Sequence, residues 1–293
     1  FQPGINRETT SYTNEGGWFD GDKVRFRQGF PEKIGGWEKL GSKSFLGSCR
    51  ALWPWRTLNL DAFLGLGTHL KYYIESGEGY YDITPIRSTT SAGDVTFSAS
   101  NGSSTITVSD PSHGAVVNDF VTFSGAASLG GNVTAAVLNQ EYQIISITDS
   151  STYTVQARAA GTTSSITVNG QYSPTPVVAN ASDSGNGGSS VIGKYQINVG
   201  LDTSVLGTGW GAGTWARGTW NSAASVDLIT DTLRIWTHDN FGENLLINVM
   251  NGGIFYWQPS GGLTNNPAVA ISSLAGANQA PTIATKVIVS DVD

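Results

Sequence analysis

The sequence predicts an all-β protein built from β-propeller-like blades, with an Ig-like β-sandwich inserted between them. Three observations predict this class. Short apolar or alternating stretches recur along the chain, separated by Gly, Asn, Asp, Ser or Pro, which is typical of strands and turns. Helical periodicity is nearly absent. A multi-strand motif also occurs twice, which is typical of propeller blades. Two blades form an incomplete ring, so either further sequence or other chains would complete it.

The composition favours a protein whose surface is covered by neighbours. Only 13% of the 293 residues are charged, well below the roughly 25% of an average soluble domain. Glycine reaches 37 residues, which suits many tight turns. A solitary monomer usually needs more charge than this to stay soluble.

The charge distribution argues against tight nucleic-acid binding. Residues 1–87 hold 11 basic against 10 acidic residues, whereas residues 88–293 hold 5 against 13, for a net charge of −7. Such binding requires a basic face, although DNA could still slide past an acidic one. Cys49 is the only cysteine, which excludes an intramolecular disulfide. No apolar run approaches the roughly 18 residues of a membrane span, so no membrane insertion is expected. The ends suggest part of a longer polypeptide that continues beyond residue 293.

The first region, residues 1–87, opens with a strand that has one basic and one apolar face. In "DKVRFRQGFPEK", Lys23, Arg25 and Arg27 alternate with apolar residues, and the turn that follows leads into Glu32 and Lys33. One interpretation is a solvated face, balanced by nearby carboxylates. The other is an edge that docks on a partner ring, which makes these five residues candidates for an interaction.

The repeated motif occupies Cys49–Gly77 and Thr232–Gly261. Each copy runs from an arginine through an aromatic strand, a polar turn, an apolar strand and a second turn to an aromatic strand that ends in glycine. The matched positions are Trp53 with Trp236, Leu64 with Leu246, and Tyr72-Tyr73 with Tyr256-Trp257. Each unit would need neighbours to bury its faces.

Residues 88–180 form the predicted Ig-like sandwich, with about six or seven Ser/Thr-rich strands. The stretch 177–190, "VVANASDSGNGGSS", indicates a flexible connector. A propeller-like β region then occupies residues 181–293. Its last predicted strand is "TKVIVSD" near the end of the chain.

The stretch "GTGWGAGTWARGTW" places Trp210, Trp215 and Trp220 five residues apart, with Arg217 between the last two. Three interpretations remain open. The indoles could form a glycan-binding platform, they could fill the core of a blade, or they could anchor contacts between subunits. The last is favoured, because tryptophan is a preferred interface anchor and glycine permits close backbone approach.

The sequence contains no recognisable catalytic motif, so we expect no enzyme, no catalytic residue, no cofactor and no metal site. His69, His113 and His238 have no metal-ligand spacing, and no G-x-S-x-G elbow occurs. The first two lie in predicted turns, where structural roles are expected. A glycan hydrolase stays as the less favoured alternative. It would use one of the carboxylate pairs Asp20/Asp22, Asp227/Asp231 and Asp239/Glu243.

Long strings of the sequence carry a family resemblance. They are "PGINRETTSYTNEGGWFDGDKVRFRQGFPEKIGGW", "FLGLGTHLKYYIESGEGYYDITPI", "GWGAGTWARGTW" and "LRIWTHDNFGENLLINVMNGGIFYW". The chain resembles a structural protein family of marine short-tailed phages (podoviruses), whose members are longer. The resemblance covers nearly the whole chain.

The resemblance implies a virion protein of the phage tail, a nozzle or tail-tube subunit that forms a ring conduit for DNA ejection. Its expected partners are copies of itself, other tail or portal-adaptor proteins and fibres, and DNA that passes without sequence-specific binding. The expected location is the virion, after synthesis in the host cytoplasm. A receptor- or glycan-binding tail module that recognises a host surface glycan is the alternative. The family supplies no catalytic motif to transfer.

Overall fold

The all-β prediction is confirmed. A computed structural model describes residues 2–8, 10, 12–36, 38, 43–161, 175–202 and 233–290. These residues form antiparallel sheets with one short α-helix and no closed barrel. The chain divides into two compact units, residues 1–42 and residues 43–293. The three-part domain division predicted from the sequence stays a prediction.

The N-terminal unit is a small hairpin module. Strand β1 (Val24–Arg27) pairs antiparallel with β2 (Phe30–Lys33), as the alternating pattern predicts. Trp18 packs edge-on against Phe26, with ring centroids 6.0 Å apart. None of the unit's described residues is buried, so this module has very little core of its own.

In the second unit, the first copy of the repeated motif forms a four-stranded antiparallel sheet, which we call blade 1. Its strands follow one another in space as they do in sequence. They are β3 (Cys49–Arg56), β4 (Ala62–Thr68), β5 (Tyr72–Ser76) and β6 (Gly79–Asp82). Such a meander is the form of a propeller blade.

The second copy forms an equivalent sheet, blade 2. Its strands are β15 (Trp236–Phe241), β16 (Asn244–Val249), β17 (Ile254–Trp257) and the short β18 (Val269–Ala270). Two 3₁₀ turns, Pro259–Gly261 and Ile271–Ser273, flank β18. The positions matched from the sequence lie on equivalent strands: the first strand, the second strand and the third strand of each blade.

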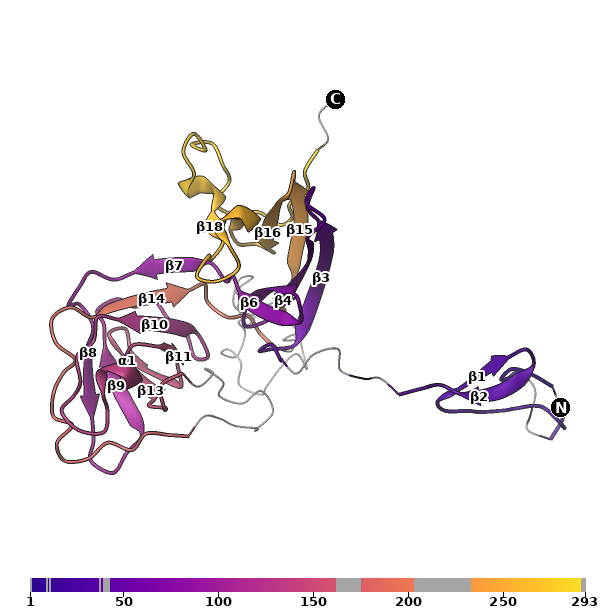
Figure 1. Cartoon of the computed structure of the whole chain (residues 1–293), viewed down its shortest axis with the longest axis horizontal. Helices are drawn as coiled ribbons and strands as arrows, with labels where there is room; N and C mark the ends of the chain where they lie inside the picture. Colours follow the sequence, from indigo (N-terminus) through magenta and orange to yellow (C-terminus); the bar gives the residue numbers. More distant parts are fainter. Residues whose placement is uncertain are drawn as a thin grey trace, which may run out of the picture. The chain divides into compact units, whose positions relative to one another are not determined.

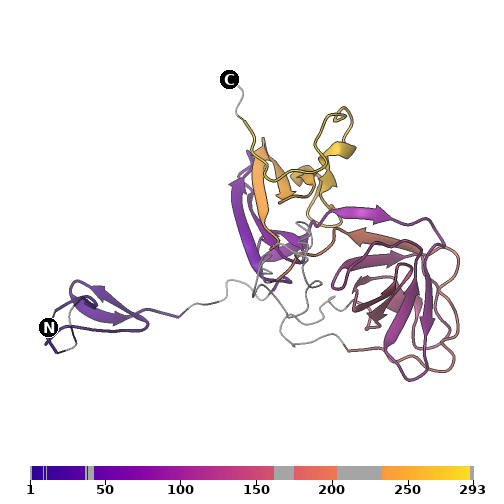
Figure 2. The same ribbon diagram turned by 180° about the vertical axis from the view of Figure 1, so that it is seen from behind.

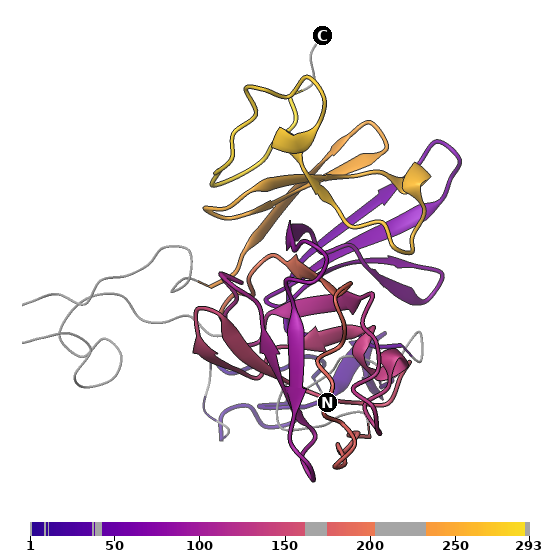
Figure 3. The same cartoon turned by 90° about the vertical axis from the view of Figure 1, so that its left-hand side faces the viewer.

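The two blades lie side by side and share one hydrophobic core (Figure 3). Blade 1 contributes Phe63, Tyr72 and Ile74, and blade 2 contributes residues from β15, β16 and β17. We call the surfaces that meet here the inner faces, and the opposite surfaces the outer faces.

Two further four-stranded sheets form a β-sandwich (Figures 1 and 2). One sheet has the order β11 (Glu141–Gln143), β10 (Phe120–Ser124), β14 (Ile192–Gln196), β7 (Ile86–Thr89). The other has the order β12 (Ser146–Asp149), β13 (Thr152–Gln156), β9 (Thr105–Ser109), β8 (Thr96–Ala99). Helix α1 (Ala135–Leu138) lies between β10 and β11 in the sequence. The Ig-like topology stays a prediction.

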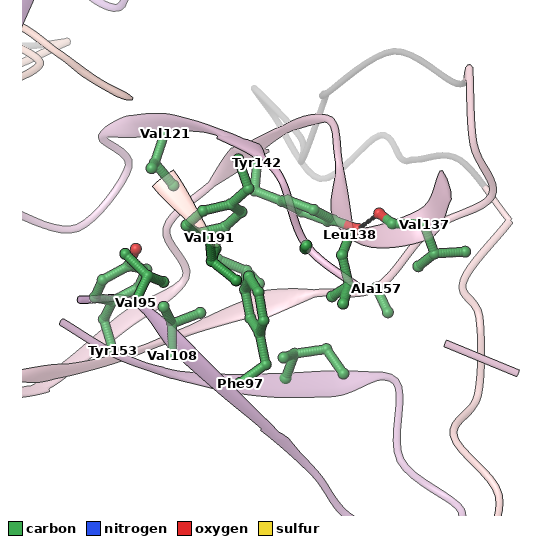
Figure 4. Packing of buried hydrophobic residues seen from close by; sticks show 14 of the residues in the cluster. Val95, Phe97, Val108, Val121, Val137, Leu138, Tyr142, Tyr153, Ala157 and Val191 are labelled. Atoms are coloured by element: carbon green, nitrogen blue, oxygen red, sulfur yellow. Dashed lines mark hydrogen bonds between the residues drawn. The ribbon is translucent and has the colours of Figure 1, made fainter. Parts of the chain in front are cut away.

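Alternating apolar residues of both sheets fill the sandwich core. Figure 4 shows Phe97 and Val108 of one sheet packing among Val121, Tyr142 and Val191. Phe97 meets Phe123 edge-on, with ring centroids 5.0 Å apart. This core is separate from the core between the blades.

The stretch 177–190 differs from the predicted flexible connector. Its backbone is bonded to the sandwich: Val177 N–H donates to Ala157 C=O (2.9 Å), and Ala179 N–H donates to Ser103 C=O (2.8 Å). Ala179 and Asp183 are buried. Polar composition alone cannot distinguish a free linker from a loop whose polar groups are satisfied by neighbouring backbone.

The predicted last strand, residues 285–291, is wrong for the residues described there. Residues 285–290 form no strand; Val287 N–H donates to Thr237 Oγ1 (3.2 Å) and Val289 N–H donates to Asp239 Oδ2 (2.7 Å). Side chains of β15 therefore accept the backbone hydrogen bonds that the backbone of a paired strand would otherwise accept. The segment covers part of the outer face of blade 2, where Val287 packs with Leu246.

Candidate functional site

Aromatic side chains from both blades meet in two groups of ring contacts between them, and we call these residues together the inter-blade seam. Its members are Trp53, Trp55, Phe63, Tyr72, Trp236, His238 and Trp257. Trp55 meets Trp257 edge-on with ring centroids 6.3 Å apart, and Tyr72 meets Trp236 at 5.0 Å. Edge-to-face pairs of this kind add to the free energy of area burial.

The indole N–H groups of the seam bond across to the opposite blade. Trp53 donates to Asn240 Oδ1 (2.6 Å), and Trp55 donates to the backbone oxygen of Glu243 (3.2 Å). In the other direction, Trp236 donates to Thr68 C=O (2.7 Å). These reciprocal bonds fix the register of one blade on the other, because a shift would leave buried donors without partners.

Close approach at the seam depends on a glycine in β4. A Cβ added to Gly67 would lie 2.5 Å from Cδ1 of Trp236, closer than real Cβ contacts allow. The pattern "FLGLGT" thus places glycine where a tryptophan of the other blade must lie against the strand.

His238 lies in the seam, stacked on Trp53 with ring centroids 6.0 Å apart and tilted against Tyr72 at 5.5 Å. Burial lowers the pKa of His238 to about 4. The imidazole is therefore neutral at neutral pH and serves as a flat packing element.

A buried lysine joins blade 1 to the sandwich. Lys71 Nζ lies 2.5 Å from Asp82 Oδ2 in the same blade and 2.5 Å from Glu141 Oε1 in the sandwich. Gln196 donates to the same two carboxylate oxygens, at 2.9 and 3.2 Å. The ammonium also lies 4.2 Å from the centroid of the Phe120 ring. Lys71 itself is 2% exposed, so this cluster is part of the interior.

The charges of this cluster compensate one another. Burial alone would lower the pKa of Lys71, but the carboxylates of Asp82 and Glu141 outweigh it and raise the pKa. Burial likewise raises the pKa of Asp82, and the nearby ammonium reverses the shift, so that the pKa is lowered. The ammonium therefore stays protonated, which suits a structural ion pair and makes it a poor nucleophile or base.

His69 and His113, predicted in turns, both accept backbone hydrogen bonds there. His69 Nδ1 accepts from Ser48 N–H (3.0 Å), and burial lowers its pKa. His113 Nδ1 accepts from Ala115 N–H (3.0 Å). Both rings therefore hold their loops in place.

Two of the three predicted carboxylate pairs, Asp20/Asp22 and Asp239/Glu243, lie in the described structure. Asp20 pairs with Arg7, with 2.5 Å between them. Asp239 accepts the N–H of Val289, and Glu243 Oε1 accepts the N–H of Leu58 (2.5 Å). Asp227 and Asp231 lie outside the described residues. Asp20, Asp239 and Glu243 therefore hold turns and segments together.

The predicted interaction residues fall into two groups. Arg25 and Arg27 lie on β1, Lys23 directly precedes that strand, and Glu32 and Lys33 lie opposite on β2. Arg25 faces Glu32 across the hairpin, with 3.1 Å between Nε and Oε2, and Lys33 is paired in register with Val24. Their role in an interaction stays a prediction. The other group, Trp210, Trp215, Arg217 and Trp220, lies outside the described residues.

Two kinds of feature are absent from the described residues. No group of three or more His, Cys, Asp or Glu side chains there could hold a metal ion. No helix in the same residues is long and apolar enough to cross a membrane.

Sequence reasoning missed the Lys71 cluster. The available signal was a lysine inside an apolar stretch, "FLGLGTHLKYYIES", where a charge needs a buried partner. Its partners Asp82 and Glu141 are 11 and 70 residues away, which periodicity cannot relate to it.

The chain shows little similarity to known proteins. No protein-family model matches the chain, and no curated protein matches it. One similar solved structure is the Phage phi92 endosialidase, with a TM-score of 0.23 and 17% identity over 73% of this chain and 28% of that chain. This chain thus spans less than a third of that enzyme. A TM-score this low supports no argument about fold or function.

The expectation that the chain is no enzyme needs correction. The matched structure is an endosialidase, which is an enzyme, so the exclusion of catalytic activity does not stand. The match is too weak to assign that activity to this chain.

Proposed function

We propose that the chain is a structural subunit of a phage tail, of the nozzle or tail-tube kind, which assembles with copies of itself around a conduit for DNA. Its further partners would be portal-adaptor proteins and fibres. The resemblance of its long sequence strings to tail proteins of marine short-tailed phages supports this assignment.

The observation that carries the proposal is the pair of blades. Two consecutive four-stranded meanders pack through one aromatic seam, yet each has a second face with exposed apolar residues. Leu52 on blade 1 is 55% exposed and Phe241 on blade 2 is 62% exposed. Two blades cannot close a propeller, so a subunit that continues the stack with its neighbours would bury these surfaces.

The charge balance agrees with a conduit. Excess acidic residues repel phosphates and lower the friction on a passing duplex, whereas a basic lining would retain it. The net charge of −7 is concentrated in residues 88–293.

The test is the position of the chain in a phage particle. A site-specific gold label, attached to Cys49, should lie on the tail axis of the intact virion, since Cys49 is exposed and unique. A label at the periphery would contradict a nozzle. Glycan binding that disappears with Trp→Ala at 210, 215 and 220 would support the receptor-binding alternative instead.

A further inference from the structure

The outer face of each blade carries exposed apolar residues that no other described part of the chain covers. Alternation along β3 places Leu52 on the outer face of blade 1, because Trp53 and Trp55 lie in the seam. Alternation along β15 places Phe241 on the outer face of blade 2, because His238 and Asn240 point into the seam. Both residues are more than half exposed.

The turn after β3 adds a second, independent observation. Leu58 and Leu60 are 89% and 71% exposed, and Leu60 adopts a left-handed backbone with φ of 68°. The turn is nevertheless well braced: Thr57 N–H donates to Asp61 C=O (3.0 Å), and Leu58 N–H donates to Glu243 Oε1. A strained backbone that presents an exposed leucine costs folding stability, so it indicates a contact outside the monomer.

Hydrogen-bond directions show how the blades are stacked. In blade 1, Thr68 N–H donates to Lys71 C=O across the β4–β5 turn (2.8 Å). Because bonding sides alternate along a strand, Phe63, which points into the seam, bonds back toward the first strand, β3. In blade 2, Val249 N–H donates to Gly253 C=O (3.3 Å), so Ile247, which also points into the seam, bonds forward to the third strand, β17.

This difference means that the two inner faces are opposite faces of the same meander. For L-residues on a strand of given direction, the side to which the side chain points fixes the side of its N–H and C=O groups. Blade 1 therefore packs its front against the back of blade 2. Such a step can be repeated, because the outer face of blade 2 is again a front and the outer face of blade 1 is again a back.

We propose that the outer face of blade 1, with Leu52 and the turn leucines Leu58 and Leu60, packs against the outer face of blade 2 of a second copy, with Phe241 and Ile288. Ile288 is 69% exposed on the segment that covers blade 2. The contact is heterologous, since two different surfaces meet, and it generates a ring or an open stack. The inference rests on the proposed assembly of copies and names its contact surface.

The experiment uses two single variants of the full chain and their mixture. Leu52→Glu places a charge on the blade 1 surface only, and Phe241→Glu places a charge on the blade 2 surface only. Val117→Glu, at a 46% exposed apolar position of the sandwich, is the matched control. Circular dichroism and Tm first establish that all three fold as the wild type does, and sedimentation velocity then measures association.

We expect each variant alone to associate at least about tenfold more weakly than the wild type, with the control unchanged. An equimolar mixture of the two variants should form a dimer and nothing larger, because one intact surface of each kind remains. Leu60→Gly should weaken association while raising Tm, since it relieves the left-handed strain.

Other outcomes would overturn the inference. If the wild type assembles and both variants assemble equally well, the contact lies elsewhere and the proposed tail assembly stands without it. If only one variant is impaired, like surfaces meet like, and the heterologous contact is wrong. A wild type that stays monomeric at every concentration would contradict both the contact and the proposed assembly.

Discussion

At the residue level, the buried ammonium of Lys71 is neutralised by two carboxylates, and both carboxylates also accept a hydrogen bond from Gln196. We expect Lys71→Met to lower the free energy of unfolding by about 3–5 kcal/mol, because Asp82 and Glu141 would remain without their counter-ion. Urea unfolding would measure the loss. Adding Asp82→Asn and Glu141→Gln should restore part of the stability, and a triple variant no more stable than Lys71→Met would contradict the ion-pair explanation.

His238 makes stability depend on pH. Its pKa is about 4 in the folded chain, because of burial, and about 6.5 when unfolded. Between these values the unfolded chain binds a proton that the folded chain does not, so stability is complete above about pH 6.5 and falls as the pH drops toward 4. The loss is on the order of 3 kcal/mol.

The matched variant is His238→Phe, which keeps a flat ring on Trp53 and removes the titration. Thermal unfolding between pH 4 and 7 should show a shallower dependence for this variant than for the wild type. Parallel curves for the two proteins would show that another group causes the acid sensitivity.

Asp183 organises the stretch that the sequence presents as a linker. Its carboxylate accepts four backbone N–H groups, at 2.8–3.0 Å, from Gly131, Asn132, Val133 and Asn180. These bonds hold the pKa of Asp183 below its usual value, although burial opposes them. Asp183→Asn should cost about 2–3 kcal/mol of stability, because an NH₂ group cannot accept.

Chemical denaturation would measure the cost, with Asp94→Asn as the comparison. Asp94 accepts a single side-chain-to-backbone bond, from Ser91 N–H, and is exposed, so we expect a loss below about 1 kcal/mol there. Equal losses at the two positions would argue against the role of Asp183.

At the level of elements, the inter-blade seam depends on glycine at one point of β4. Gly67→Ala should destabilise the chain by about 1–3 kcal/mol, because the new methyl group would collide with Trp236. Near-UV circular dichroism should change with it, since the indole is displaced. Gly35→Ala, which has no atom within 4 Å of its added Cβ, is the control and should change neither signal.

Strand positions could be predicted well from the sequence where one face is buried. The stretch "AFLGLGT" coincides with β4, and "NLLINVM" starts at the first residue of β16 and ends one residue after it. Apolar residues and flanking turn residues mark both strands in the sequence. The correspondence of blade 1 to blade 2 was visible as a repeat for the same reason.

The rest depends on contacts between distant residues. Residues 285–290 have a strand-like pattern, but the side chains of Thr237 and Asp239 capture their backbone. Short β18, with two residues, has no periodicity to detect. The Lys71 cluster forms only where three distant segments of the chain come into contact, and the local sequence pattern does not indicate such contacts.

For the whole molecule, the sandwich is attached to blade 1 by buried charge. Lys71 connects to Glu141. Asp119 holds the segment that leaves β14 by accepting from Val199 N–H (2.8 Å) and Asn198 Nδ2 (2.6 Å), and Gly200 N–H in that segment donates to His69 C=O between β4 and β5 (2.8 Å). The second unit is thus held together by specific polar contacts as well as by its cores. Such contacts suit the proposed subunit, which would present blade faces to its neighbours.

The central claim is that copies of this chain cover the outer blade faces of one another. Sedimentation equilibrium of the full-length chain over a wide range of concentrations tests it most directly. The blades predict a reversible increase in mass from one copy to a defined multimer, and electron micrographs of that multimer should show rings with an open centre. A mass that stays at one copy throughout, with the exposed leucines still in water, would contradict it.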